Sequence, residues 1–152
     1  DMVHAAYLGT LGVDVTAVYR ELYERRSPGA VPLEGRALAG MRTVADGRAL
    51  IAVLTRADYA ASGAADHEAE GVVERLRAVD GVDVVALVKE QEGSPRVRVS
   101  LRSSGADVSA LAARRGGGGH VQAAGFEADE SPEEVTEWLS SALARLLSTA
   151  SS

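Results

Sequence analysis

Arginine alternates with apolar residues in the segment RVRVSLRS at residues 96–103, and this spacing suggests a binding surface for an anion. Successive side chains of a β-strand point to opposite faces, so a strand here would gather its arginines on one face and its apolar residues on the other. The planar guanidinium of arginine can donate two hydrogen bonds at once to a phosphate. We therefore expect Arg98 and Arg102 to face an anionic ligand. The alternative is that the arginines form only a solvated face of the strand.

Four consecutive glycines follow at residues 116–119, between Arg115 and His120. Glycine has no Cβ, so its backbone can approach a ligand closely and its exposed N–H groups can form an anion-binding concavity. The run does not fit a Walker loop, which needs Gly-Lys-Ser/Thr, or a dinucleotide fingerprint after a first strand. A flexible linker is the alternative, and spacing alone leaves both interpretations open.

His120 directly follows the last glycine, where an imidazole can donate a hydrogen bond to a phosphate or a ribose. The histidines of the chain are too widely spaced for a zinc site, and the absence of cysteine excludes disulfides and thiolate ligands. Paired acidic residues occur at predicted helix starts, where they complement the helix dipole. We therefore identify no catalytic residue and no metal ligand in this sequence.

The net charge of the chain is −6, but residues 93–126 carry +4, so the remainder carries −10. A short basic region on an acidic protein is typical of a focused anion site and argues against a broad nucleic-acid-binding face. The length of 152 residues, with 46% hydrophobic and 25% charged residues, suits one ordinary globular domain. No stretch approaches the roughly 18 apolar residues of a membrane span, so we expect a soluble, cytoplasmic protein with no membrane partner.

Interleaved strand and helix patterns predict an α/β fold with a mixed central sheet and flanking helices. The connection QEGSP predicts an antiparallel hairpin between two of the strands. The last helix has the clearest start, because Ser131 and Glu134 form a capping box around Pro132. Predicted helices cover residues 14–25, 33–44, 66–79, 107–115 and 131–147, and predicted strands cover 49–55, 82–90, 96–102 and 125–129.

The segment SPGAVP at residues 27–32 interrupts the helical patterns on either side of it. Proline and glycine both disfavour a continuous helix, so this segment predicts a linker or a domain boundary. We therefore expect the main domain to comprise residues 33–152.

The segment VSLRSSGADVSALAARRGGGGHVQAAGF at residues 99–126 resembles the C-terminal, DHH-associated substrate-binding domain of the DHH phosphoesterases. The matching motifs occur in the same order: SLRS at 100–103, DVS at 107–109 and GGGGHVQAAG at 116–125. Within that family the chain is most similar to the nanoRNase/pAp phosphatases, which are NrnA-like oligoribonucleases. The segment at residues 12–24 also resembles the connection between the two domains of these enzymes.

This resemblance implies substrate-binding roles for residues of the three motifs. Arg102 and Ser103 would contact a phosphate, and His120 would hold the terminal nucleotide. Arg98 and Arg115 would be electrostatic neighbours of the same site. The glycines expected to offer backbone N–H groups are Gly116, Gly117, Gly118 and Gly119.

The resemblance also implies a catalytic half that this sequence does not contain, because no Asp-His-His motif occurs in it. Residues 1–32 would then be terminal helices and a linker from an N-terminal DHH domain that holds two Mn²⁺ ions, and the fragment alone would be inactive. The complete enzyme would hydrolyse short oligoribonucleotides or pAp to mononucleotides, as a homodimer. The alternatives are the substrate domain of a cyclic-di-AMP or pApA phosphodiesterase, and a non-catalytic interaction domain with a flexible glycine connector.

Overall fold

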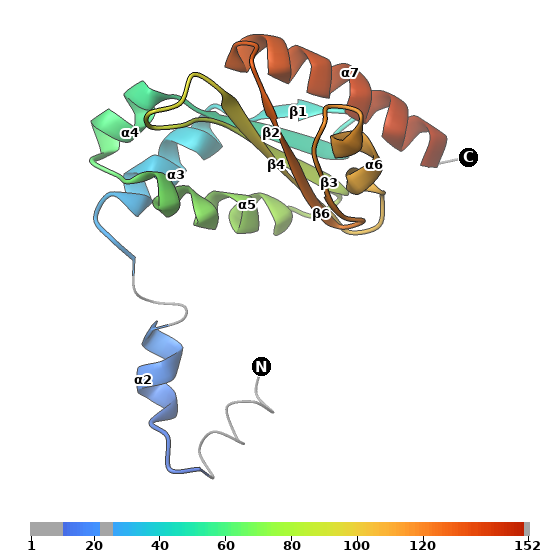
Figure 1. The fold of residues 1–152 in the computed structure, drawn as a ribbon. Coiled ribbons are helices and arrows are strands. Elements are labelled where there is room, and N and C mark those ends of the chain that lie inside the picture. Colours follow the sequence, from blue (N-terminus) through green and yellow to red (C-terminus); the bar gives the residue numbers. More distant parts are fainter. Residues whose placement is uncertain (1–10, 22–25, 151–152) are drawn as a thin grey trace.

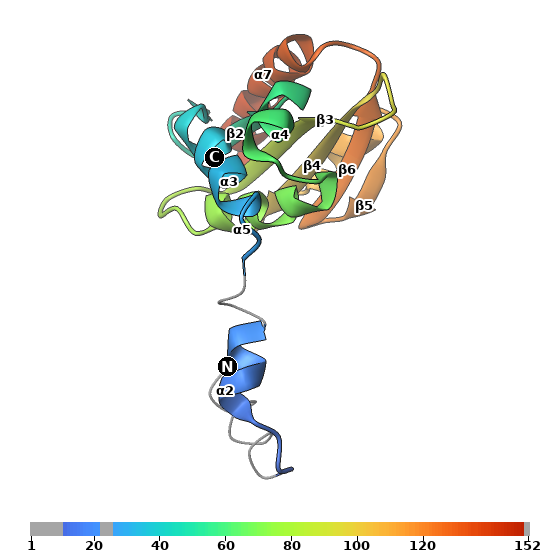
Figure 2. The ribbon, with the colours of Figure 1, turned by 90° about the vertical axis from the view of Figure 1, so that its left-hand side faces the viewer.

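The computed structural model describes residues 11–21 and 26–150, which form an α/β structure (Figure 1). A six-stranded sheet lies between two groups of helices (Figure 2). The helices are α2 (Val15–Tyr19), α3 (Ala30–Ala39), α4 (Arg56–Ser62), the 3-10 helix η2 (Asp66–Ala69), α5 (Glu70–Arg77), α6 (Val108–Ala113) and α7 (Pro132–Ala150). The strands are β1 (Arg42–Val44), β2 (Ala49–Leu54), β3 (Val84–Glu90), β4 (Val97–Ser103), β5 (Gly118–His120) and β6 (Ala123–Ala128).

The sheet has the strand order β1-β2-β3-β4-β6-β5, which makes β1 and β5 its edge strands. β2 and β3 are parallel and are joined by a crossover through α4, η2 and α5. The other neighbouring pairs are antiparallel, including the hairpin of β3 and β4. The predicted α/β fold with a mixed sheet and the predicted antiparallel hairpin are therefore confirmed.

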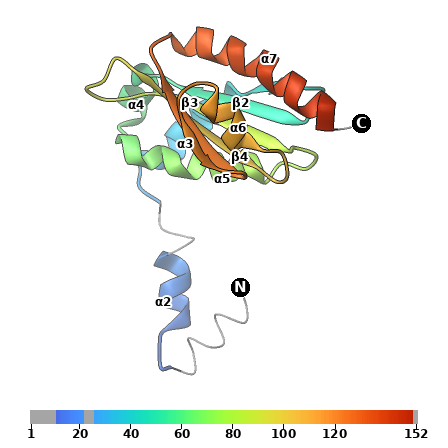
Figure 3. The ribbon, with the colours of Figure 1, turned by 45° about the vertical axis from the view of Figure 1, so that its right-hand side comes forward.

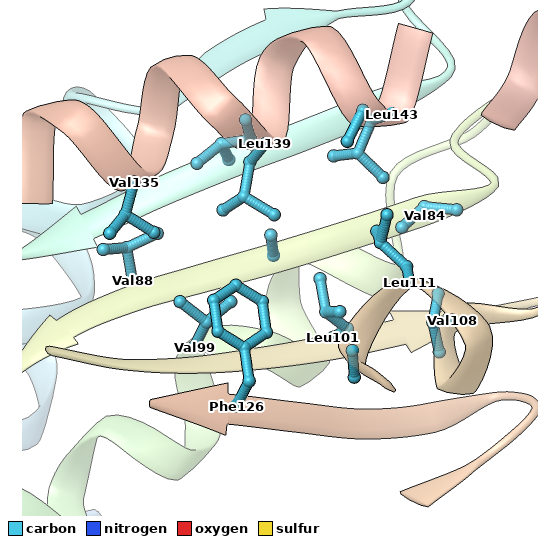
Figure 4. Packing of buried hydrophobic residues seen from close by; sticks show 14 of the residues in the cluster. Val84, Val88, Val99, Leu101, Val108, Leu111, Phe126, Val135, Leu139 and Leu143 are labelled. Atoms are coloured by element: carbon cyan, nitrogen blue, oxygen red, sulfur yellow. The ribbon is translucent and has the colours of Figure 1, made fainter. Parts of the chain in front are cut away.

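The larger core lies between the sheet and the helices α6 and α7 (Figure 4). Val135, Leu139 and Leu143 of α7 point toward the sheet, where Val99 of β4 and Phe126 of β6 lie beneath them. All of these side chains are buried. Removing this much apolar surface from water fixes α7 and α6 on one face of the sheet.

A second core lies on the opposite face, where α3, α4 and α5 pack against β2 and β3 (Figure 3). Its sheet residues are Leu50, Ala52 and Leu54 of β2 and Val85 and Leu87 of β3. The same face continues across β4, β6 and β5, but there its side chains are exposed or only partly buried. The helices thus leave one half of this face accessible.

The predicted helix over residues 33–44 is wrong at both ends. α3 begins at Ala30, within the segment that we expected to be a linker, because the buried side chains of Ala30 and Leu33 anchor its first turns in the fold. It ends at Ala39, and Gly40 is its C-cap. The residues that follow pair with β2 as β1, after which a turn contains Ala45, Asp46 and Gly47 with positive φ.

Besides β1, two elements are absent from the prediction. α4 starts with a capping box in which Thr55 and Asp58 satisfy each other's backbone N–H groups. β5 is formed by part of the glycine run, although glycine has a low strand propensity. It is a strand because it pairs with β6, which itself begins at Ala123, two residues before the predicted start.

Asp14 caps α2, as predicted, by accepting a hydrogen bond from the N–H of Ala17 at 3.1 Å. The last residues of the predicted helix, 22–25, lie outside the described residues. The predicted start of α7 is also confirmed, because Ser131 and Glu134 accept each other's backbone N–H groups. Within the described ranges, no helix has the length and apolar character needed to cross a membrane.

Candidate functional site

β4 separates its side chains as the alternation predicted. Three of its residues are buried in the larger core: Val97, Val99 and Leu101. The intervening residues point to the accessible half of the opposite face: Arg98, Ser100 and Arg102. The sheet therefore carries arginine on a surface that no helix layer fully covers.

The strand register brings the glycine run to the same surface. Ser100 of β4 pairs with Gly125 of β6, which pairs with Gly118 of β5. Arg102 likewise pairs with Ala123, which pairs with His120. Residues directly opposite each other in antiparallel strands share a face. We call this surface the open face, and it consists of Arg98, Ser100, Arg102, Gly118, His120, Ala123, Gly125 and Glu127.

The middle of the open face is a floor with almost no side chains. Ser100, Gly125 and Gly118 form it, one from each strand. Basic residues stand at its two ends, because Arg98 and Arg102 are four residues apart on β4, a separation of about 13 Å in an extended strand. His120 lies at the Arg102 end. A flat ligand could lie on this floor with anionic groups at either end.

A pocket of about 400 Å³ adjoins the Arg98 end, where the glycine run leaves α6 and approaches β6. Glycine backbone and arginine side chains make up most of its wall. It is lined by Arg96, Arg98, Arg115, Gly116, Gly117, Gly118, Gly125, Phe126 and Glu127. Two of the predicted arginines and three of the predicted glycines therefore lie around one cavity.

The four glycines of the run have different structural roles. Gly116 has a φ of +79° and ends α6, and its N–H donates to the carbonyl of Ala113 at 3.1 Å. The N–H of Gly117 donates to the carbonyl of Ala112 at 3.0 Å. These two amides are thus engaged within the chain, which differs from the expectation that all four would face a ligand.

The space around Gly117, Gly118 and Gly119 shows which of them packs against β6 and which borders open space. A Cβ at Gly117 would lie 2.1 Å from the carbonyl oxygen of Gly125, and one at Gly119 would lie 2.5 Å from that of Ala123. Both glycines therefore allow the backbone to pack closely against β6. A Cβ at Gly118 would meet no atom within 4 Å. Gly118 is the glycine whose missing side chain leaves space over the open face.

Arg115 is held by the protein itself. Its Nη2 atom donates to both carboxylate oxygens of Glu130 at 2.6 Å, and its guanidinium lies 4.8 Å from the ring centre of Trp138 and 5.6 Å from that of Phe126. The backbone N–H of Glu130 and the Arg115 guanidinium lower the pKa of the Glu130 carboxyl. Arg115 therefore fixes the start of the glycine run and contributes its charge to the pocket wall from a fixed position.

The resemblance assigned a phosphate contact to two residues of the SLRS motif, and their side chains point to opposite sides of β4. Arg102 is on the open face, but Ser103 is buried at 2% exposure on the opposite side of β4. The Oγ of Ser103 accepts the N–H of Gly105 at 3.0 Å and so stabilises the turn after the strand. At the end of the strand, however, Arg102 and Ser103 both line a small cavity of about 80 Å³, together with Arg77 of α5.

Lys89 is a basic residue of this surface that the sequence reasoning missed. It lies on β3 directly opposite Arg98, so its half-buried side chain shares the face with that arginine. Burial lowers the pKa of Lys89, and the neighbouring Arg98 charge lowers it further. One signal in the sequence could have identified it, because Lys89 is the sole lysine among the 16 Lys and Arg residues.

The open face does not fit a bound metal ion. Among residues 11–21 and 26–150, no three side chains of the His, Asp and Glu types come together in a way that could hold one. Apart from the carboxylate of Glu127, its side chains offer hydrogen-bond donors and positive charge, which suit the recognition of an anionic ligand.

A family model described as the DHHA1 domain matches residues 46–149 of the chain. This range includes every residue of the open face and excludes the helices α2 and α3. The match therefore covers the site and every strand of the sheet except β1.

Two solved structures resemble the chain along most of its length. An exopolyphosphatase-related protein from Bacteroides fragilis has 26% identity and a TM-score of 0.81, with 94% of this chain and 43% of that chain covered. A pGpG-specific phosphodiesterase from Vibrio cholerae has 12% identity and a TM-score of 0.57, with 91% of this chain and 45% of that chain covered. The second similarity concerns the fold alone. The chain spans less than half the length of both proteins.

Proposed function

Because this chain belongs to the DHHA1 domain family, we propose that it is the substrate-binding domain of a DHH-family phosphoesterase, with the open face as its binding surface. The ligand would be a short ribonucleotide. The resemblance of the SLRS and GGGGHVQAAG motifs to those of the nanoRNase/pAp phosphatases supports a ligand of this class. The preferred substrates are short oligoribonucleotides or pAp, and the alternatives are pApA and cyclic-di-AMP.

The observation that carries the proposal is the convergence of small and basic residues on the open face. Ser100, Gly125 and Gly118 leave room for a flat group, and Arg98 and Arg102 flank that room with positive charge. The glycine run is a helix cap and a strand of the sheet, which disfavours the alternative of a flexible connector. A basic surface on a protein of net charge −6 attracts an anion locally without making the whole protein bind nucleic acid.

In this proposal the open face binds and orients the ligand, and hydrolysis takes place outside it. Arg98 and Arg102 would donate charge-assisted hydrogen bonds to phosphate oxygens, and His120 would donate to a phosphate or a ribose. Two Mn²⁺ ions in a separate DHH domain would supply the chemistry of bond cleavage. Holding the scissile group at a fixed position relative to those ions is the contribution expected of the present domain.

Substitution of Gly118 by alanine tests the proposal. The new methyl group would project into empty space above the floor, so the fold should persist while a flat ligand loses its contact with the strands. We expect isothermal titration with pAp, pApA and cyclic-di-AMP to identify a ligand for the unmodified chain. G118A should weaken the binding of that ligand at least tenfold, which corresponds to about 1.4 kcal/mol.

The matched control is G105A. A Cβ at Gly105 would also meet no atom within 4 Å, and this residue lies in the turn after β4 rather than on the open face. G105A should bind as the unmodified chain does. Absence of binding for all of the ligands, or equal affinity of the unmodified chain and G118A, would contradict the proposal.

A further inference from the structure

Two cations lie side by side at one end of the open face. Lys89 of β3 pairs directly with Arg98 of β4, and both side chains are on the same face of the sheet. Like charges directly opposite each other destabilise an antiparallel pair. Lys89 makes no salt bridge with a described residue, and Arg98 reaches only Glu127, at 3.6 Å. The pair therefore brings an unfavourable repulsion that no contact within the described fold removes.

Three acidic groups lie near this pair, Asp66 and Glu70 beside Lys89 and Glu127 beside Arg98, and two of them are shared with other arginines. Asp66 accepts hydrogen bonds from Nη1 of Arg56 at 2.7 Å and from the N–H of Glu92 at 2.9 Å. Glu127 also pairs with Arg96, at 3.0 Å. Arg98 thus shares the carboxylate of Glu127 with Arg96, and Asp66 is held by Arg56 rather than by Lys89.

We propose that Lys89 and Arg98 together bind the terminal phosphate of the nucleotide that lies on the open face. This inference rests on the proposed function and adds a binding residue to it. A terminal phosphate monoester carries between one and two negative charges at neutral pH, which matches two adjacent cations better than the single charge of an internal phosphodiester. The position at the end of the floor suits an end group of the ligand, and Arg102 at the other end remains for a second anionic group.

Substitution of Lys89 tests the inference through two ligands that differ by one group: pApA and its dephosphorylated counterpart ApA. K89Q should weaken pApA binding about tenfold in isothermal titration and leave ApA binding within twofold, because only pApA carries the terminal phosphate. K89R should retain pApA binding. R42Q removes one positive charge from β1 at the opposite edge of the sheet, and it should change neither affinity.

The outcomes separate this inference from the proposed function. If the unmodified chain binds pApA and G118A abolishes that binding, but K89Q weakens pApA and ApA equally or weakens neither, the assignment of Lys89 is overturned and the proposed function stands. If the unmodified chain binds pAp or cyclic-di-AMP but not pApA, the assignment of Lys89 fails and the proposed function stands; if it binds none of these ligands, both fail. Urea unfolding of K89Q should show a stability equal to or above that of the unmodified chain, since the substitution removes a like-charge contact.

Discussion

Gly117 and Gly118 are neighbours in the chain, yet their surroundings differ. The backbone of Gly117 lies against Gly125 and Phe126, and no space for a methyl group remains there. Gly118 faces open space. One glycine is thus needed for packing and the other for access to the open face.

We predict that G117A destabilises the domain and that G118A does not. The methyl group of G117A would overlap backbone atoms that cannot rotate away, so the free energy of unfolding should fall by about 1–3 kcal/mol. G118A should stay within about 0.5 kcal/mol of the unmodified chain, as a surface substitution does. Urea unfolding followed by circular dichroism measures both. Equal stability of the two variants would show that the run does not pack against β6 as described.

Single residues of the site were predictable where a local rule governs them. The alternation along β4 placed Arg98 and Arg102 on the face away from the core, and the register confirms that arrangement. The same alternation places Ser103 on the face opposite Arg102, which conflicts with the phosphate contact that the resemblance implied for both residues. Lys89 was missed because only the pairing of β3 with β4 places it beside Arg98.

At the scale of elements, α7 was predicted from its capping residues, whereas α4 was missed despite a capping box of its own and the two shortest strands were missed because they depend on pairing. The capping residues at α7 mark its start within the sequence itself. β1 and β5 are three residues long, which is too short for a pattern, and the Gly-Gly-His sequence of β5 also has a low strand propensity. They form because an adjacent strand offers a ladder of hydrogen-bond partners, which is tertiary information.

The crossover between β2 and β3 contains two aspartates, Asp58 and Asp66, whose pKa values are lower than usual. Burial alone would raise the pKa of Asp66, but the N–H of Glu92 and the Arg56 guanidinium outweigh it and lower the pKa. For Asp58, hydrogen bonds from Thr55 and the Arg36 side chain likewise outweigh burial and lower the pKa. A carboxyl whose pKa is lower in the folded state stabilises the fold above its unfolded pKa, and this contribution is lost as the pH falls through the folded value.

We therefore predict that the free energy of unfolding decreases as the pH falls below about 4, the region of an unperturbed aspartate. D66N should reduce stability at pH 7 and should make the decline below pH 4 shallower. The side chains of Asp66 and Arg56 are 34% and 37% exposed, so screening by water limits the difference to about 1 kcal/mol or less. Urea unfolding at pH 7, 5, 4 and 3 measures it. Parallel pH curves for D66N and the unmodified chain would contradict the prediction.

At the scale of the whole molecule, the segment before α3 is attached firmly to the domain. Arg26 forms a salt bridge with Glu34 of α3, and Ser27 donates a hydrogen bond from Oγ to Glu68 of η2 at 2.7 Å. Gly29 lies so close to α4 and the loop after it that a Cβ there would meet the Cα of Ala64 at 2.9 Å. If a catalytic domain precedes this segment, as we propose, these contacts set the direction from which the chain enters the binding domain.

Glu34 is the centre of this attachment, because it is only 7% exposed and also lies 3.8 Å from Nε of Arg75. We predict that E34Q lowers the free energy of unfolding by about 1–2 kcal/mol, since a nearly buried carboxylate loses its charge beside two guanidinium groups. Amide exchange at residues 26–30 should become faster, while ligand affinity on the distant open face should not change. E74Q is the matched control: Glu74 is 67% exposed and pairs with Arg77 at 3.5 Å, so its substitution should cost less than about 0.5 kcal/mol. Equal effects of E34Q and E74Q on stability and exchange would show that the salt bridge of Arg26 does not hold the segment in place.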